Sequence, residues 1–401
     1  MWIPRLVEER VRSLAATRPV VVLTGARQTG KTSLAKRLFP AYGYVSLDLP
    51  SEAAQAEHDP ARFVSRHPAP LVIDEVQYAP GVLRHLKRIV DTRRAVPGQF
   101  VLTGSQPFNL MQGVAESLAG RAAVIQLEGL SFTELKAVAP DIAVTDVLLK
   151  GGFPELHAEP SIDRTEFFRS YVACYLERDL RSQLRVGNLR DFERFLRAAA
   201  LRSAQLLNKA ELARDIGISG STAGEWLALL DRGGVISLLE PWFSNRGKSL
   251  VKRPKLLFLD VGLCSFLMGL GNTSDLEASP LIGSLWETLV CSEVRRLLAE
   301  QMSSLQLHFW RDRSKEADLL LHAGGRFLVA DAKWTELPDL SAARRLARVC
   351  RELPPQTVTR AAIICRTANR YPLHRDGQLL IEAISLADLP EWLSPPSNDA
   401  A

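Results

Sequence analysis

The chain lacks the cysteine patterns that mark metal-bound or disulfide-stabilised domains. Its five cysteines lie far apart, and none forms a CxxC pair or a Cys/His spacing: Cys174, Cys264, Cys291, Cys350 and Cys365. We therefore expect neither a zinc site nor a disulfide framework.

Long hydrophobic runs are also missing. No run approaches the roughly 18–20 apolar residues that span a bilayer. The first ten residues, MWIPRLVEER, bring in proline and charge at once, so they lack the apolar core of a signal peptide. We expect no membrane span and a cytoplasmic location.

The charge excess is small. The net charge of +5 permits nucleic-acid binding but does not require it. Hydrophobic residues make up 46% of the chain and charged residues 24%, as in ordinary globular proteins. A chain of 401 residues is too long for one ordinary core, so we expect two or three domains.

A phosphate-binding loop is the clearest motif. The apolar run PVVVL is followed by GARQTGKT, which fits GxxxxGK[ST] and precedes a helix-like stretch to Phe39. Glycines let the backbone amides turn toward a phosphate, Lys31 reaches its oxygens, and the Thr32 hydroxyl ligates Mg²⁺. The pattern predicts a site for ATP and Mg²⁺ made by Gly25, Ala26, Arg27, Gln28, Thr29, Gly30, Lys31, Thr32 and Ser33.

Two acids follow a second apolar run. In LVIDE, Asp74 would hold the Mg²⁺ shell and Glu75 would polarise the attacking water. A third strand-like run, QFVLTGS, ends in hydroxyls that would sense the γ-phosphate; we favour Ser105, with Thr103 nearly as suitable.

Arg121 closes the stretch ESLAGR. It is either an arginine finger that acts in a neighbouring subunit, a sensor in its own site, or an ordinary surface arginine. A finger that acts in trans would require an oligomer.

The motifs GARQTGKTSL, YVSLDLP, LVIDEVQ, FVLTGSQ, ESLAGR and GGFPE stand in order within residues 1–155. In this order and spacing they resemble the AAA+-like ATPases of bacteria and archaea that carry a C-terminal domain of unknown function. The resemblance implies a parallel-sheet ATPase core with a small helical lid, but no defined substrate.

The middle of the chain is helical in pattern. Residues 160–205 carry many arginines, which form either a solvated helix face or a groove for phosphates. Residues 208–230 predict a helix-turn-helix around Gly217, and residues 235–239 and 255–259 predict the strands of a wing. The second helix offers no Arg or Lys for base edges. Basic residues that follow it would suit phosphates better: Arg246, Lys248, Lys252, Arg253 and Lys255.

The last motif consists of an acid, a strand turn and then an Asp-x-Lys pattern. Side chains two apart in a strand share a face, so Asp331 and Lys333 should converge with Asp318. These carboxylates would hold Mg²⁺, Glu287 on a preceding helix would complete the shell, and Lys333 would position the water. The arrangement predicts a restriction-endonuclease-like site, and the resembled family's C-terminal domain is similar to Holliday-junction resolvases and restriction-type nucleases. The alternative is a decayed nuclease fold used for docking.

Together these features predict an α/β multidomain protein: an AAA+-like core in residues 1–155, a helical lid and winged-helix segment in 156–275, and a PD-(D/E)XK nuclease-like domain in 276–401. We expect an ATPase that acts on nucleic acid, with DNA as partner and a possible homo-oligomer. The alternative function is an ATP-dependent switch with an inactive nuclease fold.

Overall fold

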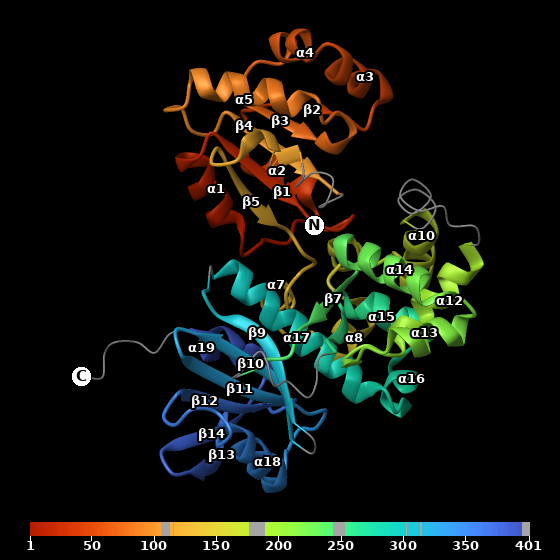
Figure 1. The fold of residues 1–401 in the computed structure, drawn as a ribbon, viewed down its shortest axis with the longest axis vertical. Helices are drawn as coiled ribbons and strands as arrows, with labels where there is room; N and C mark the ends of the chain where they lie inside the picture. The colour runs from red at the N-terminus through yellow and green to blue at the C-terminus, as the bar shows by residue number, and fades with distance from the viewer. Residues whose placement is uncertain are drawn as a thin grey trace. The chain divides into compact units, whose positions relative to one another are not determined.

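The computed structural model describes residues 1–105, 113–114, 116–175, 189–243, 253–301, 303–312 and 315–394. The chain divides into two compact units (Figure 1). The first unit comprises Met1–Leu130, Phe153–Glu159 and Ala228–Val235, and the second comprises Ser131–Gly152, Pro160–Leu227 and Ile236–Ala401. No boundary between the units falls at residue 155 or 275, and the three-part division stays a prediction.

A parallel sheet forms the centre of the first unit. Its described strands are ordered β2-β3-β4-β1-β5 and pair in parallel. The predicted parallel-sheet core is therefore confirmed. The strands are β1 (Val20–Thr24), β2 (Gly43–Ser46), β3 (Leu71–Asp74), β4 (Phe100–Gly104) and β5 (Ala122–Gln126). The helices are α1 (Glu8–Thr17), α2 (Lys31–Leu38), α3 (Pro50–His58), α4 (Pro60–Arg66), η1 (Val76–Tyr78), α5 (Val82–Thr92) and α9 (Pro154–Ala158).

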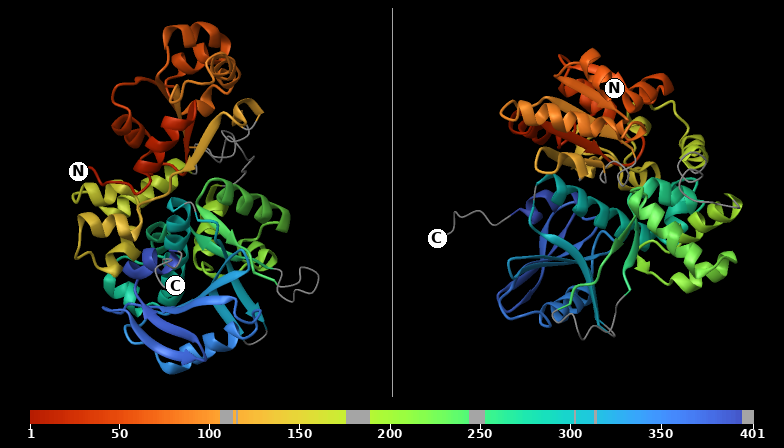
Figure 2. Two further views of the ribbon diagram at one scale, coloured as in Figure 1. Left: turned by 90° about the vertical axis from the view of Figure 1, so that its left-hand side faces the viewer. Right: turned by 45° about the horizontal axis from the view of Figure 1, so that its top comes forward.

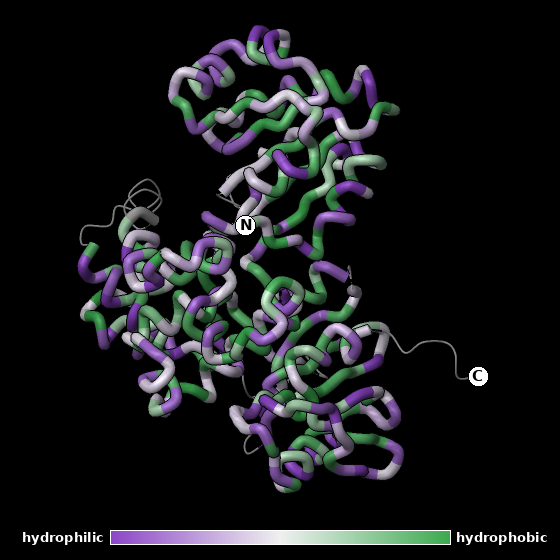
Figure 3. Tube along the Cα trace, turned by 180° about the vertical axis from the view of Figure 1, so that it is seen from behind, coloured by the Kyte–Doolittle hydropathy of each residue, from purple (hydrophilic) through white to green (hydrophobic). Residues whose placement is uncertain are grey.

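Both faces of this sheet are covered by helices. Alternate β1 residues such as Val20 and Val22 pack toward α3, α4 and α5, whereas Val21 and Leu23 pack toward α1 and α2. Because successive side chains of a strand point to opposite faces, a strand buried on both sides reads as a continuous hydrophobic run. Figure 3 colours the backbone by hydropathy and shows hydrophobic segments within the first unit.

Helices and a small sheet make up the first part of the second unit. The helices are α7 (Phe132–Val138), α8 (Val144–Lys150), α10 (Arg164–Tyr175), α12 (Leu189–Ala200), α13 (Lys209–Ile216), α14 (Gly220–Arg232), α15 (Val261–Leu267) and α16 (Thr273–Ala278). Strands β6 (Gln205–Leu206), β7 (Ile236–Leu239) and β8 (Lys255–Phe258) pair antiparallel in the order β6-β8-β7. Helix α14 begins in the second unit, and its last residues belong to the first.

A mixed sheet lies in the rest of the second unit, and Figure 2 shows it from two further sides. Within the described residues its strand order is β13-β14-β12-β11-β10-β9. Its strands are β9 (Gln306–Asp312), β10 (Lys315–Ala323), β11 (Arg326–Ala332), β12 (Val358–Ile364), β13 (Tyr371–Asp376) and β14 (Leu379–Ile384). The helices are α17 (Ile282–Glu300), α18 (Leu340–Cys350), η3 (Leu386–Asp388) and α19 (Leu389–Leu393). The apolar side of α18 packs on one face of the sheet through Ala343 and Leu346.

No helix among the described residues is long and apolar enough to cross a membrane. Of the cysteines, the four whose side chains the structure describes are buried and free: Cys264, Cys291, Cys350 and Cys365.

Candidate nucleotide site and carboxylate cluster

The GARQTGKT loop connects the carboxyl end of β1 to the first turn of α2. Gly25 has φ +145°, and a Cβ added there would lie 2.1 Å from the carbonyl oxygen of Leu127. Gly30 caps α2 with φ +91°, in the left-handed region. Only glycine fits the first position without displacing backbone, so the loop geometry accounts for these two motif residues.

Lys31 is buried, and its ammonium group is folded onto the loop itself. Nζ donates to the carbonyl oxygens of Gly25 at 3.1 Å and Ala26 at 2.6 Å. Burial lowers the pKa of Lys31 to about 8; the charge of Glu75 opposes this change and that of Arg27 adds to it. A phosphate at the loop would stabilise the charged form of this lysine.

Asp74 is the centre of the polar contacts beside the loop. Its carboxylate accepts hydrogen bonds from the Thr32 hydroxyl at 2.8 Å, the Tyr44 hydroxyl at 2.9 Å, and the Thr103 hydroxyl. Mg²⁺ prefers oxygen ligands and in nucleotide sites uses one or two protein groups together with phosphates. The adjacent oxygens of Thr32 and Asp74 fit that ion.

Glu75 and Ser105, which the motifs assign to the same nucleotide site, are in contact. The Ser105 hydroxyl donates to the Glu75 carboxylate at 2.7 Å, and Thr103 accepts from the Glu75 amide at 3.2 Å. Glu75 has φ +55°, a backbone conformation that costs energy for a non-glycine residue and is enriched at functional sites. Thr103 thus contacts Asp74 and Ser105 contacts Glu75, so both sensor candidates lie at the acidic pair.

Arg121 lies away from the loop of its own chain. It immediately precedes β5, whose first residue pairs in register with Val20 and whose last pairs with Thr24. The phosphate-binding loop leaves the other end of these strands, about 15 Å away at the usual rise per residue. Arg121 instead pairs with Asp91 of α5, with Nε 2.5 Å from the carboxylate. The reading of Arg121 as a sensor in its own site therefore does not fit this geometry.

Sequence reasoning missed two residues around the loop. Arg5 is buried and donates to the carbonyl oxygens of Thr29 at 2.9 Å and Glu128 at 2.8 Å, so it braces the loop against the segment after β5. Tyr44 lies in YVSLDLP, but its contact with Asp74 depends on the pairing of β2 with β3. Neither residue carries a local pattern that would have identified it.

The predicted C-terminal residues do converge. Lys333 Nζ lies 3.5 Å from carboxylate oxygens of both Asp318 and Asp331. The Asp318 carboxylate also accepts from the Ala332 amide at 3.0 Å, and the Asp318 amide donates to Asp331 at 3.3 Å. The antiparallel pairing of β10 with β11 brings the two acids together.

Lys255 of β8 occupies the position that the prediction gave to a metal ion. Its ammonium lies 2.6 Å from Glu287, 2.8 Å from Glu316 and 3.2 Å from Asp318. Within the described residues, no group of three or more His, Cys, Asp or Glu is arranged to hold a metal ion. The predicted Mg²⁺ shell of Glu287, Asp318 and Asp331 therefore does not fit, because a cationic side chain already takes up the acidic oxygens. The suggestion that Lys255 contacts phosphates is also wrong for this arrangement, since its side chain is only 3% exposed.

The acids of this cluster differ in the direction of their pKa shifts, because Lys255 and Lys333 both lie close to Asp318. Burial raises the pKa of Glu287 to about 8 and that of Asp331 to about 7, and the charge of Asp318 adds to both effects. Burial alone would raise the pKa of Asp318 as well, but Lys255 and Lys333 outweigh it and hold that pKa below its ordinary value. Asp318 is therefore the anionic centre of the cluster.

The predicted helix, glycine turn, helix and two strands occur in the expected order. Gly217 ends α13 with φ +83°, and Trp226 of α14 packs edge-on against Phe192 and Phe195 of α12. The apolar side of α14 is therefore buried against α12. Arg253 is exposed, whereas Arg246, Lys248 and Lys252 lie outside the described residues.

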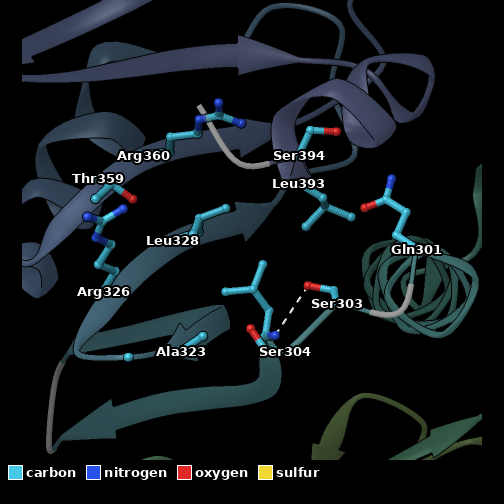
Figure 4. A pocket seen from close by; sticks show the side chains of 12 residues that line it. Gln301, Ser303, Ser304, Ala323, Arg326, Leu328, Thr359, Arg360, Leu393 and Ser394 are labelled. Carbon is cyan, nitrogen blue, oxygen red and sulfur yellow. Dashed lines mark hydrogen bonds between the residues drawn. The ribbon is translucent and has the colours of Figure 1, made fainter. Parts of the chain in front are cut away.

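A cavity of about 650 Å³ lies on the sheet of the second unit, at the opposite end of β11 from Asp331. Figure 4 shows Arg326 and Thr359 on one side of it, Gln301 and Ser303 on the other, and Leu328 between them. It contains none of the predicted site residues.

Comparison with known proteins divides the chain into matched regions. Residues 17–136 match an AAA domain. Residues 142–274 match a domain of unknown function (DUF8612), and residues 282–389 match another (DUF4143).

Solved structures with partial similarity include the Walker-type ATPase paby2304 of Pyrococcus abyssi and the RuvB Holliday junction branch migration motor of Thermotoga maritima. The first is 17% identical, with a TM-score of 0.43 over 66% of this chain and 96% of that one. The second is 18% identical, with a TM-score of 0.32 over 59% of this chain and 90% of that one.

Two curated relatives match nearly the whole chain. They are the uncharacterized proteins Rv2008c of Mycobacterium tuberculosis and Mb2031c of Mycobacterium bovis. Each is 32% identical over 377 residues, which cover 91% of this chain and 80% of the relative. The chain therefore belongs to the same family as these two mycobacterial proteins, and it carries an AAA-type ATPase domain in its amino-terminal part.

Proposed function

We propose that the protein is a Mg²⁺-dependent ATPase that acts on nucleic acid, with its ATPase core coupled to a winged-helix segment and a nuclease-like C-terminal domain. The hydrogen bond between Thr32 and Asp74 is the observation that supports the ATPase part of this proposal. It joins the end of the phosphate loop to the acid at the end of β3. Mg²⁺ held there would neutralise charge on the phosphates of ATP.

The residues around this bond have separate tasks in the proposed reaction. Lys31 would leave the loop carbonyls and contact the phosphates, and Glu75 would accept a hydrogen bond from the attacking water. Ser105, which contacts Glu75 at 2.7 Å, would hold that carboxylate in place until the γ-phosphate arrives.

Exposed arginines support contact with nucleic acid. Helix α18 buries its apolar side on the mixed sheet and exposes Arg344, Arg345 and Arg348. Guanidinium groups on one helix face suit the phosphates of a nucleic-acid backbone and would make affinity fall with added salt.

The path of α14 supports coupling between ATP and the rest of the chain. The helix begins in the second unit, and its end lies in the first. Gly234 follows it closely, and a Cβ built there would come within 3.8 Å of the Ala26 side chain in the phosphate loop. A nucleotide-dependent change in the loop would therefore act on the end of this helix.

The contacts of Lys255 favour a second candidate function. A nuclease of this class needs a metal at its acidic residues, and an ammonium group contacts Glu287, Glu316 and Asp318. The protein would then be an ATP-dependent switch whose nuclease-like domain binds DNA or a protein partner without cutting.

One set of assays tests both candidates. ATP hydrolysis and DNA cleavage are measured with single-stranded, duplex and four-way-junction DNA and with RNA, in Mg²⁺ or Mn²⁺, for the wild type, Lys31→Ala and Asp331→Ala. Action on nucleic acid predicts stimulated hydrolysis that is absent in Lys31→Ala, and it fails if neither DNA nor RNA stimulates. Metal-dependent cutting that Asp331→Ala abolishes would reject the switch, whereas hydrolysis without cutting supports it.

A further inference from the structure

The Lys255 ammonium lies among acidic side chains from two elements of the second unit. Glu287 comes from α17, and Glu316 and Asp318 come from β10. An ammonium group has three donors and no acceptor, and here three carboxylates lie within 3.2 Å of Nζ. The hydrogen-bonding capacity of the side chain is therefore used within the cluster.

The position of Lys255 is set by a paired strand. It opens β8, where it lies opposite Leu239 of β7 and Leu206 of β6. The residues that follow it, from Leu256 to Phe258, are buried. A lysine anchored in this way differs from a surface lysine, because the paired strand fixes its backbone beside the acids and its side chain is only 3% exposed.

A divalent ion and this ammonium exclude one another. Mg²⁺ would need carboxylate oxygens at about 2.0–2.1 Å, and a dication a few ångströms from a buried ammonium is strongly repelled. Asp318 also has Lys333 at 3.5 Å on its other oxygen. Both carboxylate oxygens of Asp318 therefore already lie close to a lysine ammonium group.

We propose that Lys255 is the resident cation of the carboxylate cluster, and that this domain takes up no divalent ion while β8 holds the ammonium there. Removal of the ammonium uncovers a divalent-cation site made by the three acids that it contacts, Glu287, Glu316 and Asp318. This inference concerns the acids around Lys255 in the second unit and does not depend on ATP hydrolysis, which is measured separately in the same preparations.

The test is Mn²⁺ binding to the full chain without nucleotide, followed by electron paramagnetic resonance and calorimetry. The wild type is expected to show no Mn²⁺ site that is sensitive to Asp318→Asn. Lys255→Met is expected to gain one site, at least tenfold tighter than any wild-type binding, and Lys255→Met/Asp318→Asn to lose it. Lys315→Met is the matched control, because it removes an exposed lysine that pairs with Glu352, and it should behave as the wild type.

Two results would overturn the proposal. One is a wild-type Mn²⁺ site that Asp318→Asn abolishes, since the ammonium would then not exclude the ion. The other is a folded Lys255→Met protein that gains no site. Should Lys255→Met not fold, Lys255→Met/Glu287→Gln removes the ammonium and one acid together, which buried ion pairs tolerate better than loss of one partner. The wild-type measurement can overturn the proposal even if neither variant folds.

Discussion

The Thr32 hydroxyl donates a 2.8 Å hydrogen bond to the Asp74 carboxylate, across 42 positions of sequence. We expect Asp74→Asn to lower the ATPase turnover number by roughly 10²-fold or more, because the amide cannot offset charge on Mg²⁺ and phosphate. Tyr44→Phe, which removes only an outer partner of Asp74, should cost about tenfold. Steady-state hydrolysis over a Mg²⁺ titration checks both, and full activity of Asp74→Asn would remove this acid from the site.

Glu75 is expected to act on the water and not on nucleotide binding. Glu75→Gln should lower turnover by roughly 10²–10⁴-fold, the range for loss of a general base, with little change in the dissociation constant for ATP. Hydrolysis and fluorescent-nucleotide binding are measured in parallel. Glu52→Gln, which breaks the surface ion pair with Arg66, is the control and should match the wild type. A large loss of ATP affinity in Glu75→Gln would contradict this role.

Gly25 and Gly217 both have positive φ but differ in surroundings. A Cβ at Gly25 would meet the Leu127 carbonyl oxygen at 2.1 Å, whereas nothing lies within 4 Å of one at Gly217. Gly217→Ala should therefore cost only about 1–2 kcal/mol of stability for its backbone conformation. Gly25→Ala should cost more and should abolish nucleotide binding. Thermal unfolding with and without ATP checks the pair, and equal effects would refute the assigned close contact.

The lowered pKa of Lys31 predicts that nucleotide binding is linked to protons. Burial brings this pKa to about 8 in the free protein. Phosphate oxygens favour the charged amine, so binding raises the pKa and takes up protons above about pH 8. Affinity for ATP should therefore fall as pH rises beyond that value. Calorimetry at pH 8.5 in buffers of different ionisation enthalpy measures the uptake, and Lys31→Met should abolish it. A pH-independent affinity would contradict the shift.

If Arg121 is an arginine finger, its distance from the phosphate loop of its own chain requires that it acts in a neighbouring subunit. We expect Arg121→Ala to slow hydrolysis roughly 10³-fold or more. Mixing it with Lys31→Ala should restore activity, because each variant supplies what the other lacks. Asp91→Asn removes the ion-pair partner of Arg121 but keeps the arginine, and it should remain active. Wild-type rates in Arg121→Ala would identify a surface arginine instead.

The parallel-sheet core was predictable because its sequence signals lie in adjacent residues. A strand buried on both faces needs a continuous apolar run, and the loop after β1 needs glycines, so both can be read from adjacent residues. The convergence of Asp318, Asp331 and Lys333 also follows from strand periodicity and a short connection.

Contacts that join distant segments were not predictable. Lys255 reads as one of several basic residues after a helix, and nothing near it indicates a buried partner. Only the pairing of β8 with β6 and β7, and the packing of α17, bring it to Glu287. The same holds for Arg5, whose partner Glu128 lies 123 positions away.

The way the chain alternates between its two units limits how the protein can be divided. The chain passes from one unit to the other after Leu130, Gly152, Glu159, Leu227 and Val235. A fragment that stops at residue 155 would lack the stretch Ala228–Val235, including the glycine beside the phosphate loop. Neither unit can therefore be inherited or exchanged as one uninterrupted piece of gene. A recombination that replaces the second unit would also have to preserve the eight residues Ala228–Val235, which belong to the first unit.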